Sequence, residues 1–239
     1  GFDYQDIVVI VRNVQPFQAS NEVCNPISLL PCEELEVALP FNLSFNGSEG
    51  GLANTGFTMV DNPSARLEID GTVTYANVPG FEPGRLSFSN GNLAINAAAG
   101  IAFVKNGTGT GFSTEVNSQI NTLGAGFNAN GYGNFSIATT IVSQFTDASL
   151  NSEQVGLWFG LNEDNFVKLV VLNGGTIELR REINGNSVTA DQVLSATIPG
   201  ANTQPVNLRL YVDIETNQLI AFYEIGNNGE VQLGSLSLP

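Results

Sequence analysis

The residues with the clearest chemical potential are the single tryptophan and several hydrogen-bonding side chains, all on runs typical of β-strands. Binding of a sugar needs an aromatic ring against the apolar face of the sugar, with amides and charged groups to meet its hydroxyls. Side chains of these types are found at Trp158, Tyr132, Asn134, Asn165, Lys168 and Arg180. We expect these six residues to lie on neighbouring strands and to form a ligand-binding surface.

Alternation along the chain predicts where the tryptophan points. Trp158 falls between Leu157 and Phe159, and successive side chains of a strand point to opposite faces, so the ring should point away from the face that carries these two neighbours. Each candidate also has a structural alternative. The tryptophan could be a core or edge-covering residue, the two basic residues could pair with nearby glutamates, and the asparagines could form turns.

The strands that must position these side chains are predicted by alternating runs between turn residues. VALPFNLSF at 37–45 alternates apolar and polar or small residues and predicts a half-buried strand. Asp70-Gly71 and Asn90-Gly91 each lie between alternating runs, which is the strongest short-range signal for a hairpin. Abundant glycine and asparagine, with little lysine, arginine or methionine, favour short strands and turns over long helices.

Two longer stretches carry a family resemblance. VGLWFGLNEDNFVKLVVL at 155–172 predicts an antiparallel hairpin around a polar turn. LRLYVDIETNQLIAFYEIGNNGEVQLGSL at 208–236 resembles a family pattern of a strand, a short acidic turn, a second strand and a final L-G strand. Both are similar to the concanavalin A-like, laminin-G-like modules of secreted bacterial proteins. The resemblance implies an all-β fold, a two-sheet antiparallel jelly-roll sandwich. This superfamily holds lectins, glycan-binding modules, glycosidases and adhesion domains, so the fold alone does not specify a ligand.

The resemblance extends over about residues 38–239 and divides the chain into three parts. Residues 1–16 are expected to hold an N-terminal strand that is the tail of a preceding domain, is exchanged with a neighbouring copy, or pairs with the main sandwich. Residues 17–37 are expected to form a linker. Related sandwiches usually continue past the L-G strand, so strand exchange between copies is a hypothesis for how the sheet is completed.

Cys24 and Cys32 lie eight positions apart, with Pro26 and Pro31 bending the chain between them into a compact loop. A disulfide between them is geometrically reasonable and implies an oxidising compartment. Two cysteines without any histidine are a poor zinc site. We therefore predict a secreted protein, extracellular or at the cell surface.

The formal net charge of −15 restricts the partners. Nucleic acids and anionic membrane surfaces would be repelled, while cations would be attracted. The sequence has no apolar run long enough to span a bilayer. Calcium is the natural candidate cation, and its oxygen ligands could come from acidic turns at Asp61, Asp164 and Asp213. Solvated turns without a metal are the alternative for each of them.

Catalytic constellations are weak in this sequence. The absence of histidine removes the Ser-His-Asp and Cys-His arrangements. Carboxylate chemistry remains, but the E-x-D-x-x-E strand of jelly-roll endoglucanases is matched only by Glu68 and Asp70, with Val73 at the third position. Hydrolysis with retention needs two opposed carboxyl groups about 5 Å apart. We predict that the protein is not an enzyme, with a glycosidase as the less favoured reading.

These observations together favour a non-catalytic recognition or adhesion module that binds a polysaccharide or cell-surface glycan. The alternative is a structural subunit of an extracellular filament, sheath or surface layer that assembles through exchange of its N-terminal strand.

Overall fold

The computed structural model describes residues 6–13, 36–61, 63, 66–67, 73–74, 80–97, 100, 118–142, 153–162 and 165–239, with backbone alone at 6–13, 61, 66–67, 73–74 and 162. These residues form strands, turns and short 3-10 helices at Leu52–Asn54, Pro83–Arg85 and Thr189–Asp191. This part of the chain contains no α-helix, so the all-β prediction is confirmed. It also contains no helix that is long and apolar enough to cross a membrane.

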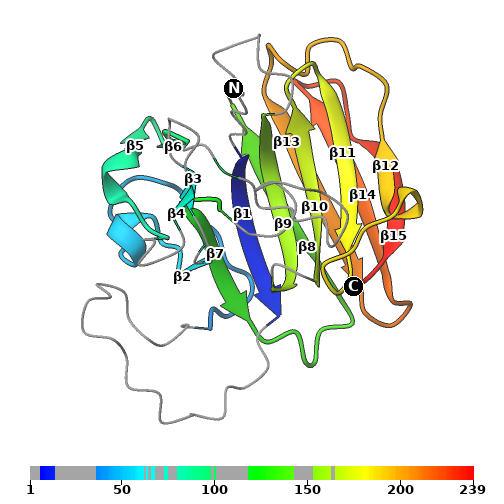
Figure 1. Ribbon diagram of the computed structural model, residues 1–239, viewed down its shortest axis with the longest axis horizontal. Helices are drawn as coiled ribbons and strands as arrows, with labels where there is room; N and C mark the ends of the chain where they lie inside the picture. Colours follow the sequence, from blue (N-terminus) through cyan, green and yellow to red (C-terminus); the bar gives the residue numbers. More distant parts are fainter. Residues whose placement is uncertain are drawn as a thin grey trace.

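Seven strands form the larger sheet (Figure 1). In order across the sheet they are β12 (Gln192–Leu194), β11 (Thr176–Glu182), β10 (Asn165–Leu172), β9 (Gln154–Asn162), β1 (Asp6–Asn13), β7 (Thr122–Phe127) and β2 (Met59–Asp61). The hairpin predicted at 155–172 is confirmed as β9 and β10, which pair antiparallel with Trp158 opposite Lys168.

The N-terminal strand β1 lies in the middle of this sheet, between β9 and β7 (Figure 1). It runs parallel to both neighbours, with Val9 opposite Leu157 on one side and Leu123 on the other. Residues 6–13 therefore lie within the sheet of their own chain. The prediction of a wholly antiparallel sandwich is wrong at β1, because no tight turn links this strand to a neighbour and imposes the opposite direction.

Four antiparallel strands form the smaller sheet. In order they are β15 (Val231–Ser237), β14 (Gln218–Ile225), β13 (Val206–Asp213) and β8 (Asn134–Ile141). The strands predicted at 208–236 are thus confirmed as β13, β14 and β15. β14 and β15 each follow the preceding strand through a short turn, which is why their order could be anticipated from the sequence.

The main core lies between the two sheets, so the chain forms a β-sandwich. The larger sheet contributes Leu157, Leu169 and Leu179, and the smaller sheet contributes Leu208 and Leu210, all of them fully buried. In β13 buried and half-buried residues alternate strictly along the strand. This alternation means that each of these strands presents one face to the core and the other away from it.

Two small hairpins lie beside the sandwich. In one, β5 (Leu86–Ser89) and β6 (Asn92–Ile95) pair around Asn90 and Gly91, whose φ angles of 52° and 73° are those of a tight hairpin turn. This prediction is confirmed. In the other, β3 (Arg66–Leu67) pairs with β4 (Val73–Thr74), and the predicted turn at Asp70-Gly71 lies outside the described residues.

The strand predicted at 37–45 is wrong as secondary structure. Its residues alternate between half-buried and exposed as expected, but the segment is joined to the larger sheet only by a bridge between Glu36 and Gly126 within the described part. Leu39 packs on the main core, whereas Phe45 packs on a second cluster beside β7. Pro40 has no N–H for a ladder. The alternation therefore predicted burial correctly but not strand pairing.

Candidate functional site

Three of the six predicted site residues form one row across the larger sheet. Trp158 on β9 lies opposite Lys168 on β10, which lies opposite Arg180 on β11, and Gln192 on β12 completes the row. Since Leu157 on the same strand packs in the core, Trp158 points to the outer face of the sheet, as predicted. The structure thus brings together the tryptophan and the two basic residues.

The Trp158 ring is not an open platform, because its exposed fraction is only 2%. Phe166 on β10 meets it edge to face, with ring centroids 4.4 Å apart. Within the described part of the chain, the indole Nε1 has no hydrogen-bond partner. A ring buried to this degree cannot stack on a sugar, so the core or edge-covering alternative describes Trp158 better than the platform does.

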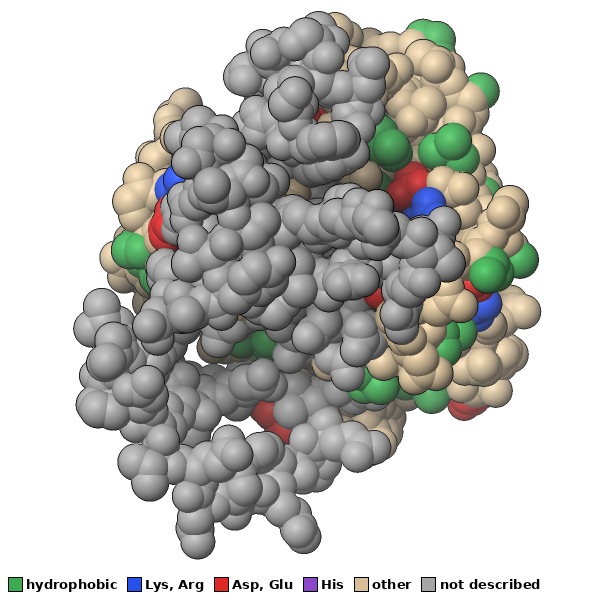
Figure 2. Space-filling view, viewed as in Figure 1, with side chains coloured by type: hydrophobic (Ala, Val, Ile, Leu, Met, Phe, Trp, Pro, Cys, Tyr) green, Lys and Arg blue, Asp and Glu red, His purple; other side chains and the backbone are tan. Residues whose placement is uncertain are grey.

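The basic residues of this row are engaged by a carboxylate. Glu178 is buried, and its two oxygens lie 3.6 Å from Lys168 Nζ and 3.4 Å from an Arg180 Nη. Lys168 also donates to Gln154, and Arg180 Nε donates to Ser187 Oγ at 3.3 Å. Figure 2 shows, on this side of the molecule, basic side chains beside acidic ones. These contacts match the structural alternative, cross-strand pairing, more closely than a free ligand-binding set.

The other predicted residues lie elsewhere. Asn165 begins β10, and its side-chain oxygen accepts the backbone N–H of Asn184. Tyr132 is 40% exposed in the turn before β8, and Asn134 is exposed at the start of β8. Since Phe135 packs in the core, Asn134 points away from it on the smaller sheet. The expectation that all six share neighbouring strands is therefore wrong, because β8 belongs to the opposite layer.

The predicted metal and disulfide residues are only partly described. Asp213 Oδ1 accepts the backbone N–H of Thr216 at 3.1 Å, and this bond holds the pKa of Asp213 below its ordinary value. The Asp61 side chain, Asp164, Cys24 and Cys32 lie outside the described residues. Among the residues that are described, no three acidic, histidine or cysteine side chains form a metal-binding group. Calcium binding and the disulfide stay predictions.

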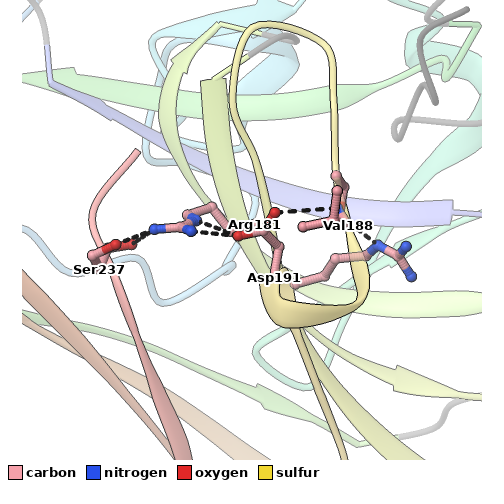
Figure 3. Close-up of polar contacts among 6 residues, drawn as sticks. Arg181, Val188, Asp191 and Ser237 are labelled. Atoms are coloured by element: carbon pink, nitrogen blue, oxygen red, sulfur yellow. Dashed lines mark hydrogen bonds and ion pairs between the residues drawn. The ribbon is translucent and has the colours of Figure 1, made fainter.

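A charged contact ties the two sheets together at the β11 and β15 edge. Figure 3 shows the Arg181 guanidinium between Asp191 and Ser237, which belong to different layers. Arg181 Nε donates to Asp191 Oδ1 at 2.9 Å, and Nη1 donates to the Ser237 carbonyl at 3.2 Å. The second oxygen of Asp191 accepts the backbone N–H of Val188 at 3.1 Å. The carboxylate is thus bonded through both oxygens while only 7% of the residue is exposed.

Asp191→Asn is expected to make the stability of the protein less dependent on acid. Burial raises the pKa of Asp191, but the hydrogen bonds from Arg181 and Val188 and the nearby guanidinium charges outweigh burial, so the pKa is lowered. An aspartate with a lowered pKa in the folded state stabilises that state at pH values above its unfolded pKa of about 3.9. This contribution to the unfolding free energy is lost as the pH falls through the folded pKa. The variant should lose roughly 1–3 kcal/mol of unfolding free energy at pH 7 and less than that at pH 3, which lies below the unfolded pKa.

Urea unfolding at the two pH values measures this difference. Glu215→Gln makes the same change in net charge at an exposed position and serves as the control. A deficit in Asp191→Asn that is equal at pH 7 and pH 3 would show that the ionised carboxylate does not contribute.

The outer face of the smaller sheet carries a second set of polar and aromatic side chains that the sequence reasoning missed. Arg209 and Tyr211 on β13 alternate with buried leucines and valine, so they point away from the core. Phe222 on β14 lies opposite Arg209, and the Arg209 guanidinium sits 4.1 Å from the centre of its ring. Both aromatic rings are half-buried, which leaves part of each surface open to a ligand.

Hydrogen bonds order the polar residues around these rings. Thr140 donates to the Asn207 side-chain oxygen at 2.6 Å, and the Asn207 amide donates to Glu224 at 2.9 Å. Arg209 Nε donates to Glu230 at 2.7 Å. The first two bonds join side chains of the neighbouring strands β8, β13 and β14 into one chain of hydrogen bonds. The side chains of this face are therefore held in defined positions.

This face is acidic on balance. The hydrogen bond from Arg209 lowers the pKa of Glu230, and the backbone N–H of Thr216 lowers the pKa of Asp213. Both carboxylates are therefore ionised at neutral pH and outnumber the guanidinium of Arg209 on this face. An uncharged ligand that offers hydroxyl donors fits such a surface better than an anion does.

Alternation could have found this face from the sequence. In LRLYVD the residues Arg209, Tyr211 and Asp213 share one parity and Leu208, Leu210 and Val212 the other. The missing information was that Phe222 stands opposite Arg209, because pairing register is set by the turn and the packing of both strands.

A groove runs beside β8, at the margin of the same sheet. Its volume is about 610 Å³. Apolar side chains of segment 37–45 and of β7 line one part of it, including Leu39, Phe41 and Phe127, while Ser136 and Thr140 line another. The groove therefore has an apolar and a polar side.

Comparisons with models of protein families, with curated proteins and with solved structures give no match to this chain.

Proposed function

We propose that the protein is a non-catalytic, extracellular recognition or adhesion module that binds a polysaccharide or cell-surface glycan. The single observation that carries the proposal is the outer face of the smaller sheet, where Tyr211 and Phe222 are half-buried within an ordered polar network. In this proposal Tyr211 and Phe222, rather than the buried Trp158, provide the aromatic surface that contacts the sugar.

The chemistry of the face suits a neutral sugar chain. Tyr211 lies two residues beyond Arg209 on β13, on the same face, and Ser136 of β8 lies opposite Tyr211. An aromatic ring can pack on the apolar face of a sugar, while carboxylates accept hydrogen bonds from its hydroxyls. The sheet holds these groups on rigid strands, which limits the entropy lost on binding.

The resemblance noted in the sequence supports a finer assignment of the fold. A concanavalin A-like jelly roll is a sandwich of two sheets, which is the coarse architecture seen here. We extend the proposal to this class of fold and to calcium held by acidic turns that include Asp61 and Asp164. Secretion would follow from the predicted Cys24 to Cys32 disulfide.

Tyr211→Ala is expected to weaken binding of a neutral polysaccharide by about fivefold to a hundredfold, because a stacked ring contributes on the order of 1–3 kcal/mol by its burial. Gel electrophoresis through immobilised laminarin, xylan or dextran measures the retardation, with alginate as an acidic polysaccharide that should bind less. Tyr132→Ala makes the same substitution in an exposed turn and should leave retardation unchanged. Equal losses in both variants, or wild-type retardation in Tyr211→Ala, would remove this face from the proposal.

A structural subunit that assembles by strand exchange is the second candidate. The observation that favours it is β1, which runs parallel to both neighbours in a sheet whose other pairs are antiparallel. A terminal strand of this kind could be supplied by a second copy with the same backbone bonds. A molar mass by light scattering that stays monomeric from micromolar to millimolar concentration would rule this candidate out.

A further inference from the structure

The edge strand β8 has one side without a partner in the described part of the chain. Along its whole length, from Asn134 to Ile141, it pairs with β13 on one side only. The order of the smaller sheet places it at the margin. Every second N–H and C=O of an edge strand points away from its sheet and can bond to an added strand.

In its own sequence and pairing, β8 lacks the charges, prolines and bulges by which proteins often protect an edge. Its sequence NFSIATTI contains no charged residue and no proline, and its pairing with β13 is regular. The other margins of the two main sheets are less receptive. β2 and β12 have three residues each, and the pairing of β15 with β14 is interrupted by a shift of register.

The groove lies along this edge and has two chemically different sides. Towards the interior it is lined by Leu39, Phe41 and Phe127, and towards the surface by Ser136 and Thr140. A strand laid beside β8 would send alternate side chains to the two sides. Its matching sequence would alternate apolar residues with small polar residues.

We propose that this groove binds an extended segment of another protein as a fifth strand of the smaller sheet. The two charged residues that line the groove, Arg209 and Glu230, are paired with each other, so the bound side chains are uncharged. The net charge of −15 repels a second copy of this chain and favours a partner segment of neutral or positive charge. Backbone hydrogen bonds to β8 would provide the affinity. The apolar side of the groove would select segments in which apolar and polar residues alternate.

The test uses the whole chain and the blocked octapeptide KTVSVTVK as the probe. Titration followed by isothermal calorimetry and by backbone NMR should show saturable binding, with the largest shifts along β8. A peptide of the same composition with its valines together, KVVVSTTK, should bind at least about tenfold more weakly, because an extended strand of this sequence cannot place all three valines on the apolar side of the groove.

Two variants place a charge at the edge. Thr139→Lys puts it at a half-buried groove position and Ala138→Lys at an exposed one, and each should weaken binding at least about tenfold. Ser235→Lys makes an equal charge change on exposed β15 and should bind like the wild type. Tyr211→Ala should also bind the peptide normally, so failure of this proposal is distinguishable from failure of glycan binding.

Three outcomes would overturn the proposal. They are the absence of saturable binding at millimolar peptide, equal affinity for the two peptides, and unchanged affinity in both edge variants that retain the wild-type spectrum. Dimerisation of the free protein that Ala138→Lys abolishes would identify a second copy as the occupant instead.

Discussion

Replacing Val9 by proline is expected to destabilise the sandwich strongly. Val9 lies in the middle of β1 and is paired on both sides, with Leu157 of β9 and Leu123 of β7. Proline has no N–H for the ladder and is therefore confined to edge strands, first strand residues and bulges. A buried backbone group left without its partner costs about 1–3 kcal/mol, and disruption of the ladder with both neighbours adds to this loss, out of a total of about 5–15 kcal/mol for a typical domain.

The position of β1 makes the effect larger than at an edge. β7 and β9 pair with β1 and not with each other, so the larger sheet is continuous only through this strand. Loss of β1 would divide the larger sheet into two parts, one made of β12, β11, β10 and β9 and the other of β7 and β2. The fluorescence of Trp158, which stands opposite Ile10, reports directly on this part of the sheet.

Urea unfolding followed by that fluorescence provides the measurement. Val231→Pro is the matched control, because Val231 is an exposed first residue of the edge strand β15, where proline is tolerated. We expect a large fall in the midpoint for Val9→Pro and a small one for Val231→Pro. A Val9→Pro midpoint equal to that of the wild type would mean that β1 does not occupy the centre of the sheet.

Gly156→Ala is expected to produce the second large loss of stability. A Cβ at position 156 would lie 2.7 Å from Val170 Cα and also against the Leu169 carbonyl oxygen on β10. Both contacts are with backbone, which cannot turn aside as a side chain does. Overpacking of this kind costs typically about 1–3 kcal/mol and can separate the two strands locally.

The same restriction applies at Gly160, where a Cβ would lie 2.6 Å from Phe166 Cα. Gly156, Trp158 and Gly160 share one parity, so the tryptophan is flanked on its own face by two positions without side chains. Together these glycines let β10 lie close to β9 around the indole.

Thermal and urea unfolding would measure the effect, with Gly84→Ala as the control. A Cβ at Gly84 would meet nothing within 4 Å, so that substitution should change the unfolding free energy little. If Gly156→Ala were as stable as Gly84→Ala, the close approach of β9 and β10 at this point would be refuted.

Local patterns explain the part of the fold that could be predicted. The hairpin at 155–172 and the turn at Asn90-Gly91 were predictable because each is closed by residues a few positions apart. The direction of Trp158 was predictable because alternation depends only on the strand itself. Neither kind of prediction requires knowledge of distant parts of the chain.

The candidate site was predicted less well. Trp158, Lys168 and Arg180 do form a row, because their strands are consecutive and antiparallel. Whether that row is open to ligands depends on what packs against it, and a Trp158 ring exposed by only 2% is not open. The face around Tyr211 was missed because its importance depends on β14 and β8 lying beside β13.

The sequence by itself determined the all-β class, the local hairpins and the two-faced character of the strands, since short-range sterics and alternation are encoded within a few residues. Only the tertiary structure decided that residues 6–13 lie between β9 and β7, that segment 37–45 forms no strand, and that β8 is a margin of the smaller sheet in the described part of the chain. These outcomes follow from burial and backbone pairing between segments far apart in the chain, which no local pattern contains.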